Sequence, residues 1–218
     1  MGASAGAVEV LIQHGAEVNA RDENNSTPLH LASSFGRNEY ATMAFQGRAD
    51  LNMRNRATVA WRSDTKWVQL LIQHGADVNA RDKNNSTPLH LAAMSDTECV
   101  RLLVQHGADV NARDKNNSTP LHLAATSDPE CMRLLIQYGA DVNARDKYNS
   151  TPLHLVSSVQ KCGIGIVCLL LEHGANKDAK DDKGRTPYEI ASSISSVVSR
   201  EIAHLISDYV FVPEGDSE

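Results

Sequence analysis

Short apolar stretches alternate with polar turns along this chain, and the alternation recurs with a fixed period. The block Thr-Pro-Leu-His begins at Thr27, Thr87, Thr119 and Thr151, and a variant, Thr-Pro-Tyr-Glu, begins at Thr186. The interval from Thr87 to Thr119 is the same as the interval from Thr119 to Thr151. Self-similarity at a period of about 20–50 residues indicates stacked structural repeats. Each copy is therefore interpreted as one structural unit.

Every Thr-Pro-Leu-His block predicts the start of a first helix. A threonine side chain can cap the free N–H groups of a helix N-terminus. A proline suits the first helical position, because no N–H partner is needed there. The central blocks have this arrangement at Thr87–Pro88, Thr119–Pro120 and Thr151–Pro152.

A second helix and a polar turn complete the unit. Aspartates separated by this same interval predict the second-helix starts at Asp64, Asp96 and Asp128. Glycines suited to a left-handed residue after a helix predict its ends at Gly75, Gly107, Gly139 and Gly174. An extended Asp-Val-Asn-Ala segment and a turn with asparagine, which tolerates positive φ, follow the glycine. The unit is thus predicted to be two helices and a hairpin-like finger.

This unit resembles the ankyrin repeat, whose length is about 33 residues and whose signature includes T-P-L-H-x-A. The resemblance covers nearly the whole chain. It implies an all-α fold, an ankyrin-repeat solenoid in which each repeat contributes a helix-turn-helix and a β-hairpin finger.

The spacing of the blocks divides the chain into repeats. We expect a partial repeat with a short helix near residues 7–14, two imperfect repeats, two complete ones, a repeat with an inter-helix insertion at 161–165, a terminal cap and an acidic tail. The predicted boundaries are 1–26, 27–54, 55–86, 87–118, 119–150, 151–185, 186–210 and 211–218. The repeat 27–54 is predicted to have a shortened finger near Arg54, the weakest joint of the array. The cap is predicted because serines replace outer apolar positions at Ser192, Ser193, Ser195, Ser196 and Ser199.

The resemblance implies that first helices and fingers line a concave groove where a partner protein binds. The predicted contacts on the first helices are Phe35, Met94 and Thr126. Those on the fingers are Arg81, Lys83, Arg113, Lys115, Arg145, Lys147 and Tyr148. Tyr148 is prominent because it replaces the asparagine of the other fingers, and aromatic residues dominate interface hot spots; neutral substitution at an exposed turn is the alternative. The recurring Arg and Lys favour either an acidic partner segment or a solvated face with local charge pairing.

Composition narrows the possible partners and locations. A net charge of −6 and a pI near 5.8 argue against nucleic acid, whose phosphates need a surplus of Lys and Arg. No apolar run approaches the roughly 20 residues that span a bilayer, so we expect no membrane partner. Four cysteines are too sparse for a disulfide framework. We expect a monomer in the cytoplasm, with the nucleus also allowed.

The histidines and cysteines predict no catalytic, metal or cofactor site. No H-E-x-x-H or comparable ligand spacing occurs. The resemblance implies instead that His30, His90, His122 and His154 brace neighbouring fingers. Cys99 and Cys131 share one repeat position and are interpreted as small buried side chains. A further hypothesis from the resemblance is hydroxylation of the finger asparagines Asn79, Asn111 and Asn143.

A non-catalytic scaffold or adaptor that binds a partner protein is the function these observations favour. Two alternatives stay open. In one, the array is the target-recognition part of an effector or a ubiquitin-ligase adaptor. In the other, it is a fragment of a larger ankyrin-containing enzyme, because the first repeat is incomplete.

Overall fold

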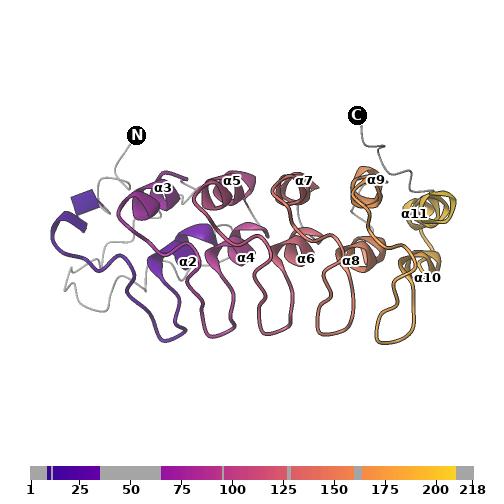
Figure 1. Ribbon diagram of the computed structural model, residues 1–218, viewed down its shortest axis with the longest axis horizontal. Coiled ribbons are helices and arrows are strands. Elements are labelled where there is room, and N and C mark those ends of the chain that lie inside the picture. The colour runs from indigo at the N-terminus through magenta and orange to yellow at the C-terminus, as the bar shows by residue number, and fades with distance from the viewer. Residues whose placement is uncertain are drawn as a thin grey trace, which may run out of the picture.

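The helices form two layers, and hairpin-shaped fingers project from one edge of the stack (Figure 1). This computed structural model describes residues 9–10, 12–34, 65–94, 96–126, 129–159 and 164–209. From α2 onward, each repeat contributes one first helix to the layer beside the fingers and one second helix to the other layer. The all-α solenoid predicted from the repeats is confirmed.

First and second helices alternate along the chain. The first helices are α2 (Pro28–Ser33), α4 (Pro88–Ala92), α6 (Pro120–Ala124), α8 (Pro152–Ser158) and α10 (Pro187–Ser192). The second helices are α3 (Thr65–Gln73), α5 (Thr97–Gln105), α7 (Pro129–Gln137), α9 (Ile164–Glu172) and α11 (Val197–Asp208).

The described punctuation residues begin and end these helices, whereas the predicted second-helix starts Asp64 and Asp128 lie outside the described residues. Proline occupies the first turn of every first helix, after an extended threonine. Asp96 caps α5 by accepting hydrogen bonds from the N–H groups of Glu98 and Cys99, at 2.9 and 3.1 Å. After the second helices, Gly75, Gly107 and their equivalents have φ near +84°, the left-handed region in which a Cβ is costly.

Leucines of both helix layers form the core. The leucine of each Thr-Pro-Leu-His block is fully buried, at Leu29, Leu89, Leu121 and Leu153. These side chains pack with second-helix residues such as Leu103 and Leu135, which are also fully buried. Each first helix touches its own second helix and the first helices of adjacent repeats, so the core runs continuously along the stack.

The fingers are closed by tight turns. In the finger 81–86, Asp82 N–H donates to Ser86 O and Asn85 N–H donates to Asp82 O, each at 3.0 Å. The asparagine that precedes the serine in the first four turns has positive φ, +57° at Asn85, and Gly184 has it in the last turn. No described residue lies in a β-strand. The fingers thus have the outline of a hairpin, and side chains supply much of the bonding between them.

The predicted boundary between repeats 27–54 and 55–86 is wrong. Helix α2 packs against both α3 and α4. Elsewhere in the stack, a first helix packs in this way against the second helix of its own repeat and the first helix of the next repeat. The finger before α2 bonds directly to the finger after α3, because Lys83 N–H donates to Asn24 O at 2.8 Å. Helices α2 and α3 are therefore paired as the two helices of one repeat, whose finger ends at Ser86.

Other expectations fall partly or wholly outside the described residues. Phe35, the joint at Arg54 and residues 161–163 of the insertion lie there, as does the tail. The weak joint was predicted from a shortened finger near Arg54. The finger before α2 and the finger after α3 bond directly to each other, so this reason no longer applies. In the last repeat, Ser192, Ser193 and Ser195 are not buried. The prediction that Ser199 occupies an outer position is wrong. Ser199 is buried, because it lies on the face of α11 that also buries Ile202 and Ile206.

Candidate protein-binding face

A row of asparagines joins the bases of the fingers. The side-chain amide of Asn79 donates to Gly107 O at 3.0 Å, and its Oδ1 accepts from Asp109 N–H at 2.8 Å. Asn19, Asn111 and Asn143 make the same pair of bonds to their next repeats. Asparagine suits this position because its amide donates through the NH2 group and accepts through Oδ1 at the same time. Their hydroxylation stays a hypothesis.

A row of buried histidines joins each first helix to the next finger. His122 Nε2 lies 3.1 Å from Ser150 O, while Thr119 N–H donates to His122 Nδ1 at 3.2 Å. His30, His90 and His154 have equivalent partners. Burial lowers the pKa of all four histidines, against the opposing effect of the carbonyl bond at Nε2. The neutral ring therefore fits its site, with Nε2 donating and Nδ1 accepting. The bracing role implied by the resemblance is confirmed.

A row of arginines crosses the fingers nearer their tips. Arg81 Nη1 donates to Asn85 O of its own finger at 3.2 Å and to Arg113 O of the next at 2.8 Å. Arg113 and Arg145 repeat this bridge, with Arg145 donating to Lys180 O. These predicted contact residues are exposed, but they also hold neighbouring fingers together. Lysines recur in the same fingers at the same interval, so the sequence alone does not distinguish the arginines as structural.

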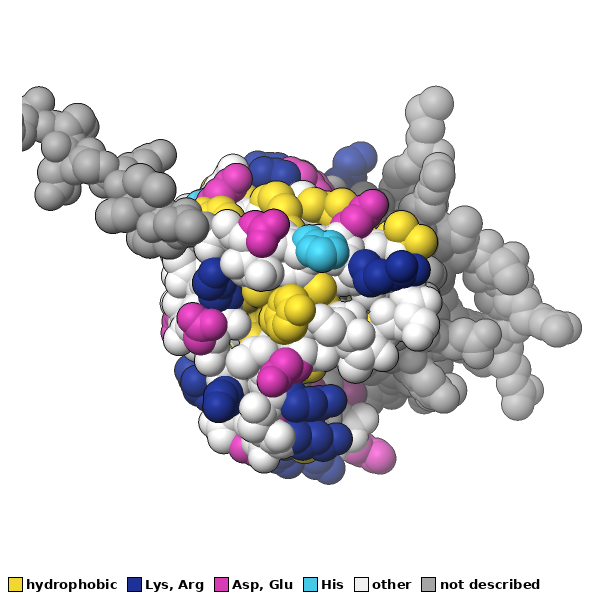
Figure 2. Space-filling model, turned by 90° about the vertical axis from the view of Figure 1, so that its right-hand side faces the viewer, with side chains coloured by type: hydrophobic (Ala, Val, Ile, Leu, Met, Phe, Trp, Pro, Cys, Tyr) yellow, Lys and Arg dark blue, Asp and Glu magenta, His cyan; other side chains and the backbone are white. Residues whose placement is uncertain are grey.

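The turn aspartates accept hydrogen bonds from backbone N–H groups of their own turns, whereas the lysine side chains are exposed to solvent. Asp82 Oδ1 accepts from the N–H groups of Asn84 and Ser86, at 2.7 and 2.9 Å. Asp114 and Asp146 do the same in their turns. The aspartates are half-buried, whereas Lys83, Lys115 and Lys147 are exposed. Seen from the C-terminal end, Lys and Arg side chains gather toward the finger end (Figure 2).

Tyr148 is the most exposed aromatic residue among those described. Its side chain is 58% exposed, and the Lys147 ammonium lies 4.8 Å from the centre of its ring. Lys147 Nζ also donates to Asn116 Oδ1 of the preceding finger at 2.6 Å. A cation held over a ring in this way restricts both side chains. The Tyr148 ring is thus presented in a defined position at one end of the lysine row.

The two described first-helix candidates lie just past their helices. Met94 follows α4 and is 41% exposed. Thr126 follows α6 and is exposed, with its hydroxyl donating to Leu123 O at 3.1 Å. These two side chains occupy equivalent positions in neighbouring repeats. The finger candidates share a second surface at the tips.

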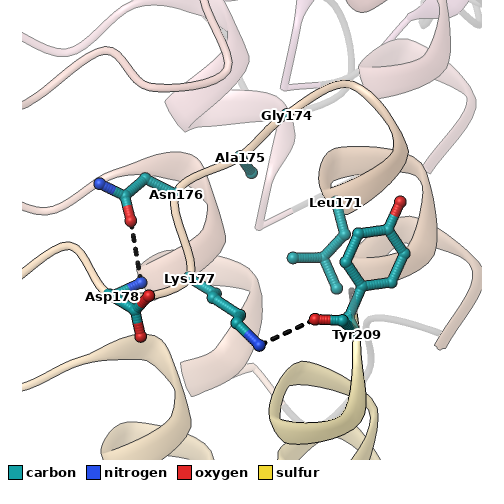
Figure 3. Close-up of a pocket in the computed structure, with 7 residues that line it drawn as sticks. All are labelled: Leu171, Gly174, Ala175, Asn176, Lys177, Asp178 and Tyr209. Atoms are coloured by element: carbon teal, nitrogen blue, oxygen red, sulfur yellow. Dashed lines mark hydrogen bonds between the residues drawn. The ribbon is translucent and has the colours of Figure 1, made fainter. Parts of the chain in front are cut away.

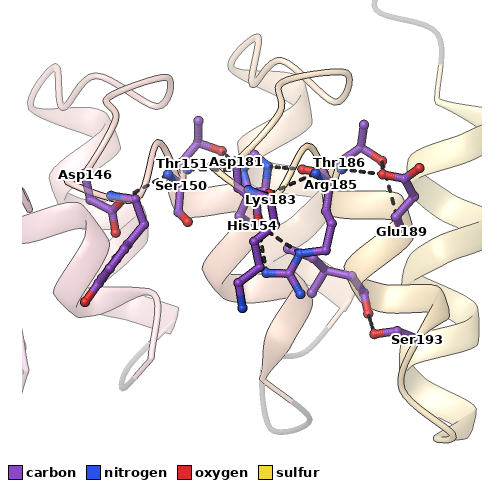
Figure 4. Close-up of polar contacts among 12 residues, drawn as sticks. Asp146, Ser150, Thr151, His154, Asp181, Lys183, Arg185, Thr186, Glu189 and Ser193 are labelled. Carbon is purple, nitrogen blue, oxygen red and sulfur yellow. Dashed lines mark hydrogen bonds and ion pairs between the residues drawn. The ribbon is translucent and has the colours of Figure 1, made fainter.

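The last finger is fixed by an ion pair within its turn. Arg185 Nη2 lies 2.8 Å from Asp181 Oδ2, and Arg185 O accepts the bond at His154 Nε2 (Figure 4). Glu189 accepts from Thr186 N–H at 2.7 Å, which replaces the histidine bond of the other repeats. This finger therefore keeps the geometry of the others with different side chains.

A pocket of about 300 Å³ lies between the end of α9 and Tyr209 (Figure 3). The ammonium of Lys177 in its lining is already engaged. Lys177 Nζ donates to Ser207 O and Tyr209 O, at 3.2 and 2.8 Å, and so caps the C-terminus of α11. The pocket is therefore interpreted as part of the end of the stack.

The described residues hold no cluster of three or more His, Cys, Asp or Glu side chains that suits a metal ion. The buried Cys99 and Cys131 match the small-side-chain interpretation, and burial raises the pKa of the Cys99 thiol well above its usual range. Such a thiol is a weak nucleophile. Within the described ranges, no helix has the length and apolar character to cross a membrane.

Comparison with known proteins agrees with this architecture. A family model for three copies of the ankyrin repeat matches residues 57–146, and two models for many copies match 6–45 and 135–191. An ankyrin repeat-containing protein of Schizosaccharomyces pombe is 32% identical over 90 residues, which cover 40% of this chain and 30% of that protein. A putative ankyrin repeat protein of fowlpox virus is 31% identical over 96 residues, 40% of this chain and 28% of that protein.

A third relative is far longer. Transient receptor potential cation channel subfamily A member 1 of Drosophila melanogaster is 31% identical over 101 residues, which cover 40% of this chain and 8% of the channel. The matched stretch thus spans less than a third of each of these relatives. Ankyrin repeats are in general protein–protein interaction modules and typically carry no catalytic site. With family models matching along most of its length, this chain belongs to the ankyrin-repeat family.

Proposed function

We propose that this chain is a non-catalytic scaffold or adaptor that binds a partner protein through its first helices and fingers. The observation that carries this proposal is the presentation of Tyr148 beside three exposed lysines on a surface whose backbone is fixed by side-chain bridges. A surface that is rigid before binding loses little entropy when a partner docks. Tyr148, Met94 and Thr126 supply contact area, and the Lys and Arg side chains supply charge.

The partner's class and setting are part of the proposal. A protein is favoured over nucleic acid because the chain is acidic overall, and over a membrane because its exposed apolar residues are scattered singly. Among the described residues, Cys99, Cys131 and Cys168 form no disulfide, which supports a reducing, intracellular compartment and a monomer without disulfide links. The relatives' greater length supports a second version, in which these repeats are the recognition part of a larger protein.

Site-specific photo-crosslinking tests which face binds. Tyr148 is replaced by the photoreactive p-benzoylphenylalanine, and the matched control carries the same replacement at Tyr138, an exposed tyrosine at the end of α7. In extract of the source cells, we expect discrete crosslinked species from position 148 that excess unmodified chain competes away. Position 138 should give none of these species. Equal crosslinking from both positions, or from position 138 alone, would contradict the proposal.

A further inference from the structure

The lysines of the finger tips occupy one structural position in consecutive fingers. Lys115 N–H donates to Asn84 O and Lys147 N–H donates to Asn116 O, at 2.8 and 2.7 Å, as Lys83 does to Asn24. In the next finger the same bond is made by Asp182 N–H, which donates to Tyr148 O at 3.0 Å. Lys83, Lys115, Lys147 and Asp182 thus form one row across the tips.

Acidic residues bracket this lysine row at both ends. Asp182 follows Lys147 in the row. Glu23 precedes Lys83 at the other end. Their positions are equivalent, because each comes directly after the turn aspartate, Asp22 or Asp82. At this one position in the fingers, the positive stretch is therefore three lysines long, although the last finger also carries Lys180 and Lys183 at other positions. An anionic segment that followed the row past either end would meet the carboxylate of Glu23 or Asp182.

Charge in the three central fingers is positive at the tips. Each tip segment, such as 81–86, carries one Arg, one Lys and one Asp. The aspartate is half-buried and bonded to two backbone N–H groups, whereas the cations face solvent. At the finger bases the exposed charge is negative, since Asp77, Asp109 and Asp141 are exposed there. An anionic segment is therefore attracted to the tips.

No ion pair among the described residues occupies the cations at the tips, although Lys147 also donates to Asn116 Oδ1 and lies over the Tyr148 ring. Within the described part of the chain, the ion pairs are Arg101–Glu98, Arg133–Glu130 and Arg185–Asp181, which involve none of the six central tip cations. The bridges between fingers use Nη1 of each arginine. The guanidinium fork is thus held in place with donors left for a carboxylate.

We propose that the lysine row binds an extended acidic segment of the partner with a carboxylate at every third residue, an inference that rests on the proposed function. Helices in adjacent repeats pack about 8–10 Å apart, so neighbouring tips are spaced similarly. A polyproline II helix has three residues per turn and a rise of about 3.1 Å, which places every third side chain on one edge at about 9 Å intervals. Three such carboxylates match Lys83, Lys115 and Lys147.

Tyr148 gives this segment a direction. It lies at the Lys147 end of the row, next to the point at which Asp182 ends the positive stretch. Exposed aromatic rings are the usual contact for prolines in polyproline II segments. The acidic partner residue nearest Tyr148 should therefore be flanked by proline or another apolar residue.

Peptide binding to the full chain tests this inference. The probe is a fluorescently labelled peptide of three Glu-Pro-Pro units, measured by anisotropy at low salt. One comparison peptide has three Glu-Pro-Pro-Pro units, which keeps the charge but changes the spacing, and a second has Lys in place of Glu. Uridine homopolymer RNA is the third comparison. We expect the Glu-Pro-Pro peptide to bind most tightly and its affinity to fall as salt rises.

Two matched variants distinguish the effect of the tip lysines on binding from the effect of net charge. The triple variant Lys83→Gln, Lys115→Gln, Lys147→Gln should weaken Glu-Pro-Pro binding about tenfold or more, because each exposed ion pair changes an equilibrium constant by about two- to fivefold. The control Lys66→Gln, Arg101→Gln, Arg133→Gln removes the same charge from exposed or half-buried positions on the second helices α3, α5 and α7, and should leave binding within about twofold.

Three results would overturn the inference: equal loss in both triple variants, equal affinity for the two glutamate spacings, or RNA binding as tight as peptide binding. Its failure is distinguishable from failure of the proposed function. If crosslinks from position 148 persist while the Glu-Pro-Pro peptide neither binds nor competes with them, the finger face binds a protein of other chemistry.

Discussion

Replacing Leu121 by alanine is expected to destabilise the chain by about 2–5 kcal/mol, the usual range for a buried leucine that leaves a cavity. Leu121 is fully buried in α6, which packs against its own second helix α7 and against α4 and α8 of the adjacent repeats. A cavity there weakens one repeat and both of its interfaces. Since the stability of a stacked array is close to a sum of such terms, a central position gives the full effect.

Urea unfolding followed by circular dichroism measures this loss. The control is Tyr148→Ala, which removes a larger but exposed side chain and should change stability by less than about 0.5 kcal/mol. If Leu121→Ala unfolds at the same urea concentration as the unchanged chain, the continuous core described above is incorrect.

Replacing His122 by leucine is expected to cost about 2–4 kcal/mol, because it removes the partners of one buried and one partly buried backbone group. Thr119 N–H and Ser150 O would each lose a hydrogen bond, and an unsatisfied buried group costs about 1–3 kcal/mol. His106→Leu is the matched control, since His106 is exposed at the end of α5. Comparable losses at the two positions would show that the histidine row does not brace the fingers.

The histidine row also predicts how stability depends on pH. Burial lowers the pKa of these histidines in the folded chain below the ordinary value of 6.5, so the unfolded chain binds protons more readily in the interval below pH 6.5. The stabilisation is complete above that pH and is lost as the pH falls toward the folded pKa. Each histidine adds a slope of up to about 1.4 kcal/mol per pH unit.

Stability measured between pH 7.5 and 5 should therefore fall steeply toward the acidic end. Four such groups act together, with a combined slope of up to about 5.5 kcal/mol per pH unit. In the variant His122→Gln this slope should be shallower by up to about 1.4 kcal/mol per pH unit, and in His106→Gln it should not change. A stability that is flat over this interval would contradict the neutral, buried state of the row.

Much of the repeat could be predicted from the sequence because its punctuation is local. The prolines after Thr87 and Thr119, the cap at Asp96 and the left-handed Gly107 act through backbone geometry that each residue type dictates nearby. Such signals do not depend on what the rest of the chain does. They specified where the helices begin and end.

The register between distant repeats could not be predicted in the same way. The segment before Asp64 was interpreted as the start of a separate repeat, because the interval between the central copies was expected to hold along the whole chain. The structure shows that α2 takes α3 as its partner across residues 35–64, a pairing decided by packing between helices far apart in sequence. Ser199 was misassigned for the same reason, since a serine's burial depends on the packing of α11.

The residues of the candidate site could be predicted from the sequence, but their separate roles in structure and in binding could not. The sequence identifies Arg81 and Lys83 equally as exposed cations. The structure separates them, because Arg81 Nη1 bridges to Arg113 O whereas Lys83 is exposed at the tip. Only the relative placement of neighbouring fingers reveals which cation is structural.

The central claim is that an uninterrupted stack of fingers runs from residues 16–26 through 76–86 to the last repeat. Amide hydrogen exchange at Lys83 tests it most directly, in a chain from which residues 36–63 are deleted so that Thr27 precedes Thr87 by the same interval as Thr87 precedes Thr119. The account predicts that this chain folds and that the Lys83 amide, which donates to Asn24 O, is protected as well as those of Lys115 and Lys147. Rapid exchange at Lys83 while Lys115 and Lys147 stay protected would contradict it.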